Sequence, residues 1–374
     1  MSTRRHALAL LAASPFLASC GARGPDPAAG WRAPGAGEAD PRRFALAHAI
    51  LAPSPHNTQS WEVAFDGASG MTLFCDLGRR LPFTDPIDRQ ITIGCGAFLE
   101  LYRLAASSLG YAAEIAIFPE GEPAPRLDAR PVAHVALLPQ ANSAPDPLFP
   151  HIAARRTNRN VYDERIPDDA LLLRATSVTG GFPGAVQWTS ALERVAALRD
   201  LVWRAFDREL RTRGAQEETY RWLRFGRGQV AERRDGLALE GPAIGVIKSL
   251  GMLDEEDFLD PHSFANQSAA KDWRRKAESA PAFVWLSSAN DAPATRLGAG
   301  VAYARLNLAA TALGLAMHPW SQALQEYGEM ADLYAEAKRV LEAEDRTVQM
   351  LARVGYAEPV PASARRDAGD FVRA

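Results

Sequence analysis

Two glycine-bounded segments that resemble one another constrain this 374-residue chain more than any other feature. One reads GCGAFLELYRLAASSLG, residues 94–110, and the other GAGVAYARLNLAATALG, residues 298–314. Aligned without gaps, they share seven of seventeen positions, including the first, third and last glycines. Their apolar residues recur at helical spacing, and a final glycine is typical of a helix C-cap. Each segment therefore predicts a long buried helix, with small residues that permit close packing.

The sequence on either side of the two segments also matches. MTLFCDL precedes the first segment, and AEIAIFP and VAHVALLP follow it. PAFVWLSS precedes the second, and QMLARVGYA comes near the C-terminus. All five runs are strand-like. Matched surroundings of this kind predict an internal duplication, with chance similarity between two Ala- and Leu-rich helices as the alternative.

The duplication predicts an α+β fold with two tandem halves. We expect the first half at 42–150 and the second at 151–374. The second half carries additional sequence at about 221–276, which mixes arginines, glycines and aromatic residues with weak periodicity. We interpret this insertion as a lid or binding segment, with a structural helical excursion as the alternative.

Residues 1–20 have the form of an export signal. A pair of arginines at positions 4 and 5 precedes an apolar run at 7–18, which is too short for an ordinary membrane span. The adjacent arginines suggest the twin-arginine route. The run ends in LASC, which resembles a bacterial lipobox and predicts lipidation of Cys20 and a membrane-anchored periplasmic protein. An uncleaved, disordered N-terminus is the alternative. Residues 21–41, rich in Gly, Ala and Pro, predict a flexible spacer.

Charge, cysteines and histidines limit the function classes further. A formal net charge of -3 without a long charge run argues against nucleic acid as a partner. With Cys20 assigned to lipid, Cys75 and Cys95 remain. We favour two small buried residues there over a disulfide. The seven histidines are scattered without a close ligand pair, so no metal site is predicted.

The stretch APSPHNTQSW, residues 52–61, is the first candidate for binding chemistry. Ser54 is placed to cap a helix whose first residue is Pro55. Asn57 and Gln59 each offer an amide donor and acceptor, which can satisfy both edges of a planar heterocycle. Ordinary capping with solvated amides is the alternative.

The stretch RRTNR, residues 155–159, is the second candidate. If it is helical, Arg155 and Arg159 share one face and repel each other, so an anion would stabilise them. A phosphate is the natural partner, because guanidinium forks match its oxygens. The alternative is a solvated basic face that pairs with Asp163 and Glu164. The basic pair Arg365–Arg366 near the C-terminus is uninformative alone.

Together these motifs resemble the flavin-dependent nitroreductase superfamily. Its Pro-Ser-x-x-Asn-x-Gln-Pro-Trp motif is similar to residues 53–61, its Arg-Arg-Ser-x-Arg motif to 155–159, and its closing Gly-Tyr run with basic residues to 355–366. The asparagine motif comes first here, which is unusual in a family whose flavin lies at a homodimer interface. The resemblance implies the Acg-type branch, a fused pseudo-dimer with the nitroreductase-like fold, in which each half is a central, mostly antiparallel sheet with long buried helices.

The resemblance also implies one FMN per chain, because neither half holds both motifs. The arginine motif would bind phosphate and ribityl oxygens, the asparagine motif would contact the isoalloxazine from the other half, and a backbone N–H in the loop 319–322 would approach N5. The implied cofactor-binding residues are Pro53, Ser54, Asn57, Gln59, Arg155, Arg156, Thr157, Arg159, Ser321, Gln322, Arg365 and Arg366. Two positions depart from the family pattern: Thr157 replaces the usual Ser, and Ser60 the usual Pro.

The implied activity is that of an exported FMN-dependent oxidoreductase. It would transfer hydride or electrons to a flat acceptor, either a nitroaromatic or a quinone-like molecule. The electron donor stays open, because NAD(P)H is scarce outside the cytoplasm. No catalytic acid or base from the protein is predicted. The alternatives are a flavin-sequestering protein with little turnover and a cofactor-free scaffold lipoprotein. A monomer is sufficient for such a fused chain, while a dimer stays open.

Overall fold

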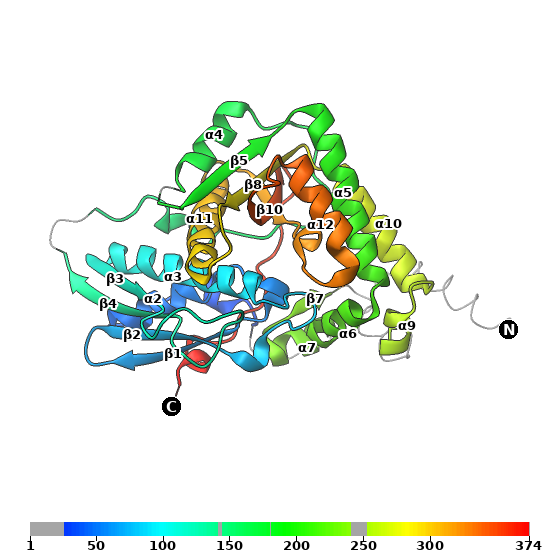
Figure 1. Ribbon diagram of the computed structural model, residues 1–374. Helices are drawn as coiled ribbons and strands as arrows, with labels where there is room; N and C mark the ends of the chain where they lie inside the picture. The colour runs from blue at the N-terminus through cyan, green and yellow to red at the C-terminus, as the bar shows by residue number, and fades with distance from the viewer. Residues whose placement is uncertain (1–25, 141–143, 180, 241–252, 374) are drawn as a thin grey trace.

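The computed structural model describes residues 26–140, 144–179, 181–240 and 253–373. Two α+β halves lie against each other, with the first half at the bottom of Figure 1 and the second above it. The predicted export signal, including Cys20, lies outside the described residues. Within the described part, no helix combines the length and apolar character that a membrane crossing requires.

The first half is built on a four-stranded antiparallel sheet. Its elements are α2 (Pro41–Ala49), β1 (Trp61–Asp66), β2 (Gly70–Cys75), α3 (Arg89–Ser108), β3 (Tyr111–Ile117) and β4 (Ala133–Pro139). The strands are ordered β1-β2-β4-β3, and each neighbouring pair is antiparallel. The three strand-like runs noted in this part of the sequence correspond to β2, β3 and β4.

The second half repeats this arrangement. Its elements are α4 (Asp169–Ser177), β5 (Gly184–Thr189), β8 (Ala282–Ser288), α11 (Pro293–Ala312), β9 (Ala316–Pro319), α12 (Ala331–Val340) and β10 (Thr347–Gly355). The strand order β5-β8-β10-β9 is again fully antiparallel and matches the first sheet element by element. This confirms the predicted α+β architecture of two tandem halves.

The two repeated segments form the long helices α3 and α11, which contact each other at their matching glycines. A Cβ at Gly96 would overlap the backbone carbonyl of Leu297, and a Cβ at Gly300 would overlap that of Ile93. In the ungapped alignment Ile93 corresponds to Leu297 and Gly96 to Gly300. The contact is therefore reciprocal, as at the two-fold axis of a homodimer, although one chain supplies both sides.

A long excursion separates β5 from β8. It spans residues 190–281, whereas residues 67–69 join β1 to β2. Its elements are α5 (Leu192–Arg211), α6 (Arg213–Trp222), β6 (Leu223–Phe225), α7 (Gly226–Arg233), β7 (Leu237–Leu239), α9 (Glu255–Leu259) and α10 (Phe264–Glu278). The insertion predicted at about 221–276 lies inside this stretch, and from here on the whole of 190–281 is called the insertion. Helix α5 packs an apolar face that includes Leu198 and Val202 into the core of the second half. In Figure 1, α6 and α7 lie beside the first half.

Short 3-10 helices complete the described chain. They span Ala29–Trp31, Pro55–Asn57, Leu77–Arg79, Phe149–His151, Gln322–Leu324, Gly328–Met330 and Ala368–Phe371. The C-terminal tail leaves the second sheet after β10 and crosses to the first half, where Val372 bridges to Val63 of β1. This crossing brings Arg365 and Arg366 to the first half.

Residues 26–40 pack against the domain, so the predicted flexible spacer at 21–41 is wrong over this part. Trp31 is 4% exposed and belongs to the main core cluster. Its indole N–H donates to the carbonyl oxygen of Ser363 at 2.8 Å. The backbone N–H of Arg365 donates in turn to the carbonyl oxygen of Pro27 at 2.9 Å. The segment is thus docked on the C-terminal tail.

The glycine contact predicts that alanine substitutions at two positions only two residues apart have very different effects on the free energy of unfolding. Gly300→Ala places a methyl group onto backbone that a side-chain rotation cannot relieve, and should lower the free energy of unfolding by at least ~2 kcal/mol. Gly298→Ala is the matched control, because its Cβ would meet only side-chain atoms of Pro183 at 3.4 Å and Phe182 at 3.7 Å, which are ordinary contacts. Urea unfolding measures both, and equal stabilities for the two variants would contradict the close approach.

Candidate functional site

Arg155 is a buried cation with incomplete hydrogen bonding. The side chain is 2% exposed, and Nη2 donates to the carbonyl oxygen of Leu51 at 2.8 Å. Its Nε and Nη1 are buried and have no hydrogen-bond partner in the described part of the chain. Burial lowers the pKa of this guanidinium to about 10. Buried donors without acceptors are costly, so these two nitrogens indicate a ligand that supplies acceptors.

Arg365 joins the same site from the C-terminal tail. Its Nε donates to Ile50 O at 2.8 Å, Nη2 to Ala52 O at 3.0 Å and Nη1 to Asn57 Oδ1 at 2.6 Å. Burial, and then the charges of two neighbouring arginines, holds the pKa of this guanidinium well below its usual range. All three nitrogens are occupied by protein acceptors. Arg365 therefore brings positive charge to the site rather than free donors.

Arg155, Arg156 and Arg365 interact electrostatically with one another, whereas Arg366 lies near Asp76, Asp235 and Asp370. Among the ion pairs of the described residues, none joins Arg155, Arg156, Arg159, Arg365 or Arg366 to a carboxylate. The predicted alternative of a solvated face paired with acids is therefore wrong, and Asp163 pairs instead with its neighbour Arg165. Residues 155–159 are also not helical. The excess positive charge of Arg155, Arg156 and Arg365, which are partly or fully buried, favours an anionic ligand.

Arg159 lies in a second group of polar side chains next to this cluster. It makes no hydrogen bond or ion pair with the described residues, and the surrounding protein lowers its pKa although its side chain is solvent-accessible. Tyr303 of α11 interacts electrostatically with both Arg159 and Arg155. Burial and the charge of Arg159 lower the pKa of His56 to about 4. His318 of β9 is likewise held neutral by burial, Arg353 and Arg159.

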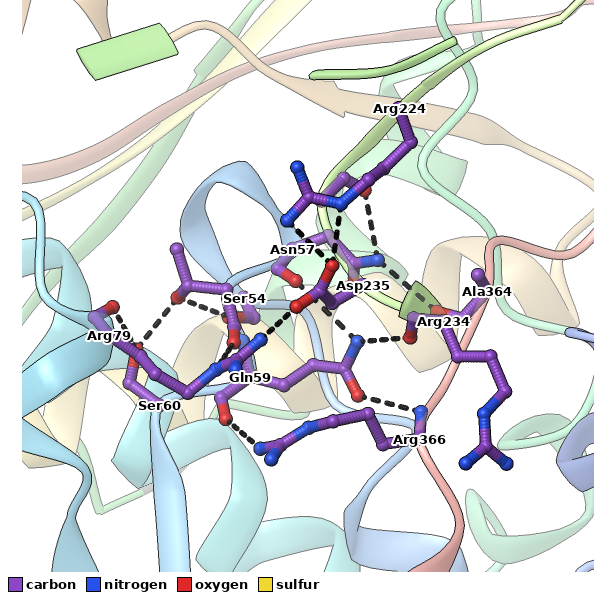
Figure 2. Close-up of polar contacts among 12 residues, drawn as sticks. Ser54, Asn57, Gln59, Ser60, Arg79, Arg224, Arg234, Asp235, Ala364 and Arg366 are labelled. Carbon is purple, nitrogen blue, oxygen red and sulfur yellow. Dashed lines mark hydrogen bonds and ion pairs between the residues drawn. The ribbon is translucent and has the colours of Figure 1, made fainter. Parts of the chain in front are cut away.

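Asn57 holds separate chain segments together. Its amide nitrogen donates to Gly236 O at 3.1 Å and to Ala364 O at 3.2 Å, and its oxygen accepts from Arg365. One amide thus links the insertion and the C-terminal tail to the first half (Figure 2). The side chain is committed to the protein rather than free for a ligand in this geometry.

Gln59 makes the same kind of link. It is fully buried, and its amide nitrogen donates to Arg234 O at 2.9 Å, while its oxygen accepts from the backbone N–H of Arg366 at 3.0 Å. The predicted capping by Ser54 is wrong, because its side chain makes no cap bond and its Oγ accepts from the Gln59 N–H. Pro55 does begin a short 3-10 helix.

The backbone of this stretch is strained. His56, Asn57 and Gln59 have φ values of 47°, 52° and 53°. The left-handed region is unfavourable for residues other than glycine, and such residues cluster at ligand-binding and active sites. The many bonds to Asn57 and Gln59 are what hold the chain in this form.

Further contacts fasten the insertion to the first half. Asp235 accepts from Arg79 and Arg224 (Figure 2). The buried carboxylate of Glu218 accepts the backbone N–H groups of Phe83 and Thr84, each at 2.9 Å. Insertion and first half are therefore joined at several points around residues 54–60 and 79–84.

The remaining predicted residues lie around these groups. Arg156 donates to the carbonyl oxygens of Ala153 and Arg155, and Thr157 makes no hydrogen bond with the described residues. Pro53 precedes the strained stretch. Ser321 precedes the 3-10 helix at 322–324 without capping it, and Gln322 is the first residue of that helix.

Three residues of the site were missed in the sequence: Trp31, His56 and Tyr303. Only Trp31 gave a signal, as a lone aromatic residue within a Gly-, Ala- and Pro-rich stretch.

Two cysteines belong to the described residues. Cys75 and Cys95 are both buried and free. Burial raises the pKa of both thiols, that of Cys95 to about 12, which makes them poor nucleophiles. In the described ranges, no group of three His, Cys, Asp or Glu side chains is arranged to hold a metal ion.

Comparison with known proteins supports a family. No protein-family model matches the chain. A Mycobacterium tuberculosis H37Rv protein, provisionally named an NAD(P)H nitroreductase, is 29% identical over 345 residues, which cover 90% of this chain and 92% of that protein. A second protein of the same strain, acg, is also provisionally named an NAD(P)H nitroreductase and is 38% identical over 78 residues, 21% of this chain and 23% of that protein. The similarity along nearly the whole chain supports the nitroreductase family, which the two sequence motifs also resemble.

Solved structures give weaker likenesses. The FMN-dependent nitroreductase NfnB from Mycobacterium smegmatis, solved with NADPH, is 19% identical with a TM-score of 0.38, over 60% of this chain and 95% of that one. An iodotyrosine deiodinase bound to FMN is 15% identical with a TM-score of 0.36, over 59% and 95% of the two chains. At these scores the family assignment rests on the sequence relatives alone.

The neutral imidazoles predict a loss of stability in mild acid. His56 has a folded-state pKa of about 4 against an ordinary value of 6.5, so the unfolded chain binds more protons between these values. Its contribution is fully present above pH 6.5 and is lost as the pH falls toward 4. Thermal unfolding between pH 7 and 4.5 should show a shallower decline in His56→Gln than in the wild type. Identical slopes would contradict the assigned neutral state.

Proposed function

We propose that this chain binds one FMN where residues 50–59 meet the five site arginines, and that it is an oxidoreductase of the nitroreductase family. One observation carries the proposal: Arg155 is buried beside Arg156 and Arg365, two of its nitrogens have no partner among the described residues, and none of the three arginines forms an ion pair with a described carboxylate. The phosphate of FMN would supply both the missing acceptors and the missing negative charge. The provisional name of the full-length relative agrees with this activity.

Different residues of the site would bind the different parts of FMN. Arg155 would bind the phosphate through Nε and Nη1, with the charges of Arg156 and Arg365 beside it. Arg159 and Thr157, which have free polar atoms, would meet the ribityl chain and the pyrimidine edge of the flavin. A cation near that edge favours the reduced, anionic flavin. FMN, when bound, supplies the hydride and electron transfer itself.

A sequestering role is the second candidate, and the fastened insertion favours it. Glu218, Asp235 and Asn57 tie the insertion to the stretch that would contact the flavin. A flavin beneath a fixed segment would exchange electrons slowly with a bulky acceptor. Stopped-flow mixing of the photoreduced protein with a nitroaromatic or a quinone separates the two roles, because rapid return of the oxidised spectrum requires an accessible flavin.

The first test of the site removes a free cation. Arg159→Ala should weaken FMN binding by ~10-fold, because a charge-assisted contact contributes ~1.4 kcal/mol or more. Arg155→Lys should also weaken it, since lysine keeps the charge but loses the fork. Flavin absorbance per protein after gel filtration and a fluorescence titration measure the loss. Arg174→Ala, an exposed arginine on α4, is the control. Wild-type retention in both site variants would remove the assignment.

We also propose that the chain is exported by the twin-arginine route and lipidated at Cys20, as a periplasmic protein on a lipid anchor. A folded-protein route is compatible with inserting FMN before export. Replacing Arg4 and Arg5 by lysine should leave the protein in the cytoplasm. Cys20→Ser should release it from the membrane into the soluble periplasmic fraction. Cell fractionation followed by immunoblotting distinguishes these outcomes, and unchanged distribution in both variants would refute the signal.

A further inference from the structure

Trp31 contacts the arginine cluster from the docked N-terminal segment. Its ring centroid lies 4.5 Å from the guanidinium carbon of Arg156, 5.1 Å from that of Arg365 and 5.5 Å from that of Arg155. One indole ring therefore makes cation–π contacts with three guanidinium groups. The ring is 4% exposed and is fixed by its N–H bond to Ser363 O.

These three cations repel one another, and elsewhere in the chain a partly buried arginine is stabilised by carboxylates instead. Arg305 is neutralised by the carboxylates of Glu100 and Asp146, at 2.7 and 2.9 Å. A carboxylate among Arg155, Arg156 and Arg365 would cancel the charge that an anionic ligand requires. The face of an indole attracts a cation through its quadrupole and carries no net charge. It can therefore stabilise the three guanidinium groups while their full positive charge remains.

We propose that Trp31 is a positioning residue of the phosphate subsite: it holds Arg155, Arg156 and Arg365 together without neutralising them. The inference rests on the proposed function, because it requires a ligand that bears a phosphate. It makes residues 26–31 part of the cofactor site, although they lie far from both sequence motifs. The backbone bond from Arg365 to Pro27 O fixes the segment beside the cluster.

The test compares FMN with riboflavin in the full-length chain. Riboflavin lacks the phosphate, so the ratio of the two dissociation constants isolates the contribution of the phosphate subsite. Trp31→Leu should lower the preference for FMN by ~10-fold, and Trp31→Phe by ~3-fold, because phenylalanine keeps a weaker quadrupole. The affinity for riboflavin should change little. Quenching of flavin fluorescence measures both constants.

Trp203→Leu is the matched control. Arg274 lies 5.9 Å from the ring centroid of Trp203, but both residues belong to the insertion, where they line a surface pocket between α5 and α10. This variant loses a comparable aromatic–arginine contact at a distance from the cluster. It should keep the wild-type preference for FMN, which shows that a general loss of packing does not lower the ratio.

Each outcome bears on the proposal. A wild-type preference in folded Trp31→Leu overturns it, and so does an equal loss of both ligands, which is the mark of a purely structural role. If thermal unfolding shows that Trp31→Leu does not fold, Trp31→Phe decides alone, with a lowered preference in support and an unchanged one against. A wild-type chain that binds neither flavin would instead refute the proposed function itself, and the role of Trp31 with it.

Discussion

The close approach of α3 and α11 is the constraint on which the rest of the structure depends. Backbone meets backbone at Gly96 and Gly300, so the distance between the two halves is set without intervening side chains. The reciprocity extends outward, because Gly94 faces Pro55 and Gly298 faces Pro183. The stretch that carries Asn57 therefore begins next to the central helix pair. Its position relative to the second half follows from the glycine contact.

Much of this fold could be predicted from local pattern. Matched glycines and helical spacing gave α3 and α11, and alternating apolar residues gave the strands around them. The start of the insertion was placed too late, although α5 has a readable apolar stripe that includes Val195, Leu198 and Val202. Trp31 could not be placed, because Gly, Ala and Pro around it indicate a spacer and its partners lie more than a hundred residues away.

The candidate site was predicted in position more fully than in chemistry. Two motifs a hundred residues apart lie close together, because Arg155 donates to Leu51 O just before the first motif and Arg159 acts electrostatically on His56 within it. What an amide binds, however, depends on which acceptors the fold brings to it. Asn57 and Gln59 carry the groups expected for a heterocycle, yet they hold backbone of the insertion and the tail. The sequence shows which side chains can donate or accept a hydrogen bond, whereas the tertiary structure determines the partner of each.

A duplicated chain can differ on its two sides in a way that a homodimer cannot. Tyr303 lies by Arg155 and Arg159, while the matching residue of α3 is Leu99. Glu100 accepts from Arg305, although the matching positions hold Ala304 and Leu101. In a symmetric dimer each of these residues would occur on both sides of the helix contact. Here the arginines beside Tyr303 have no carboxylate partner among the described residues, whereas Arg305 is neutralised by Glu100. A single anionic cofactor per chain is the arrangement that such an asymmetry favours.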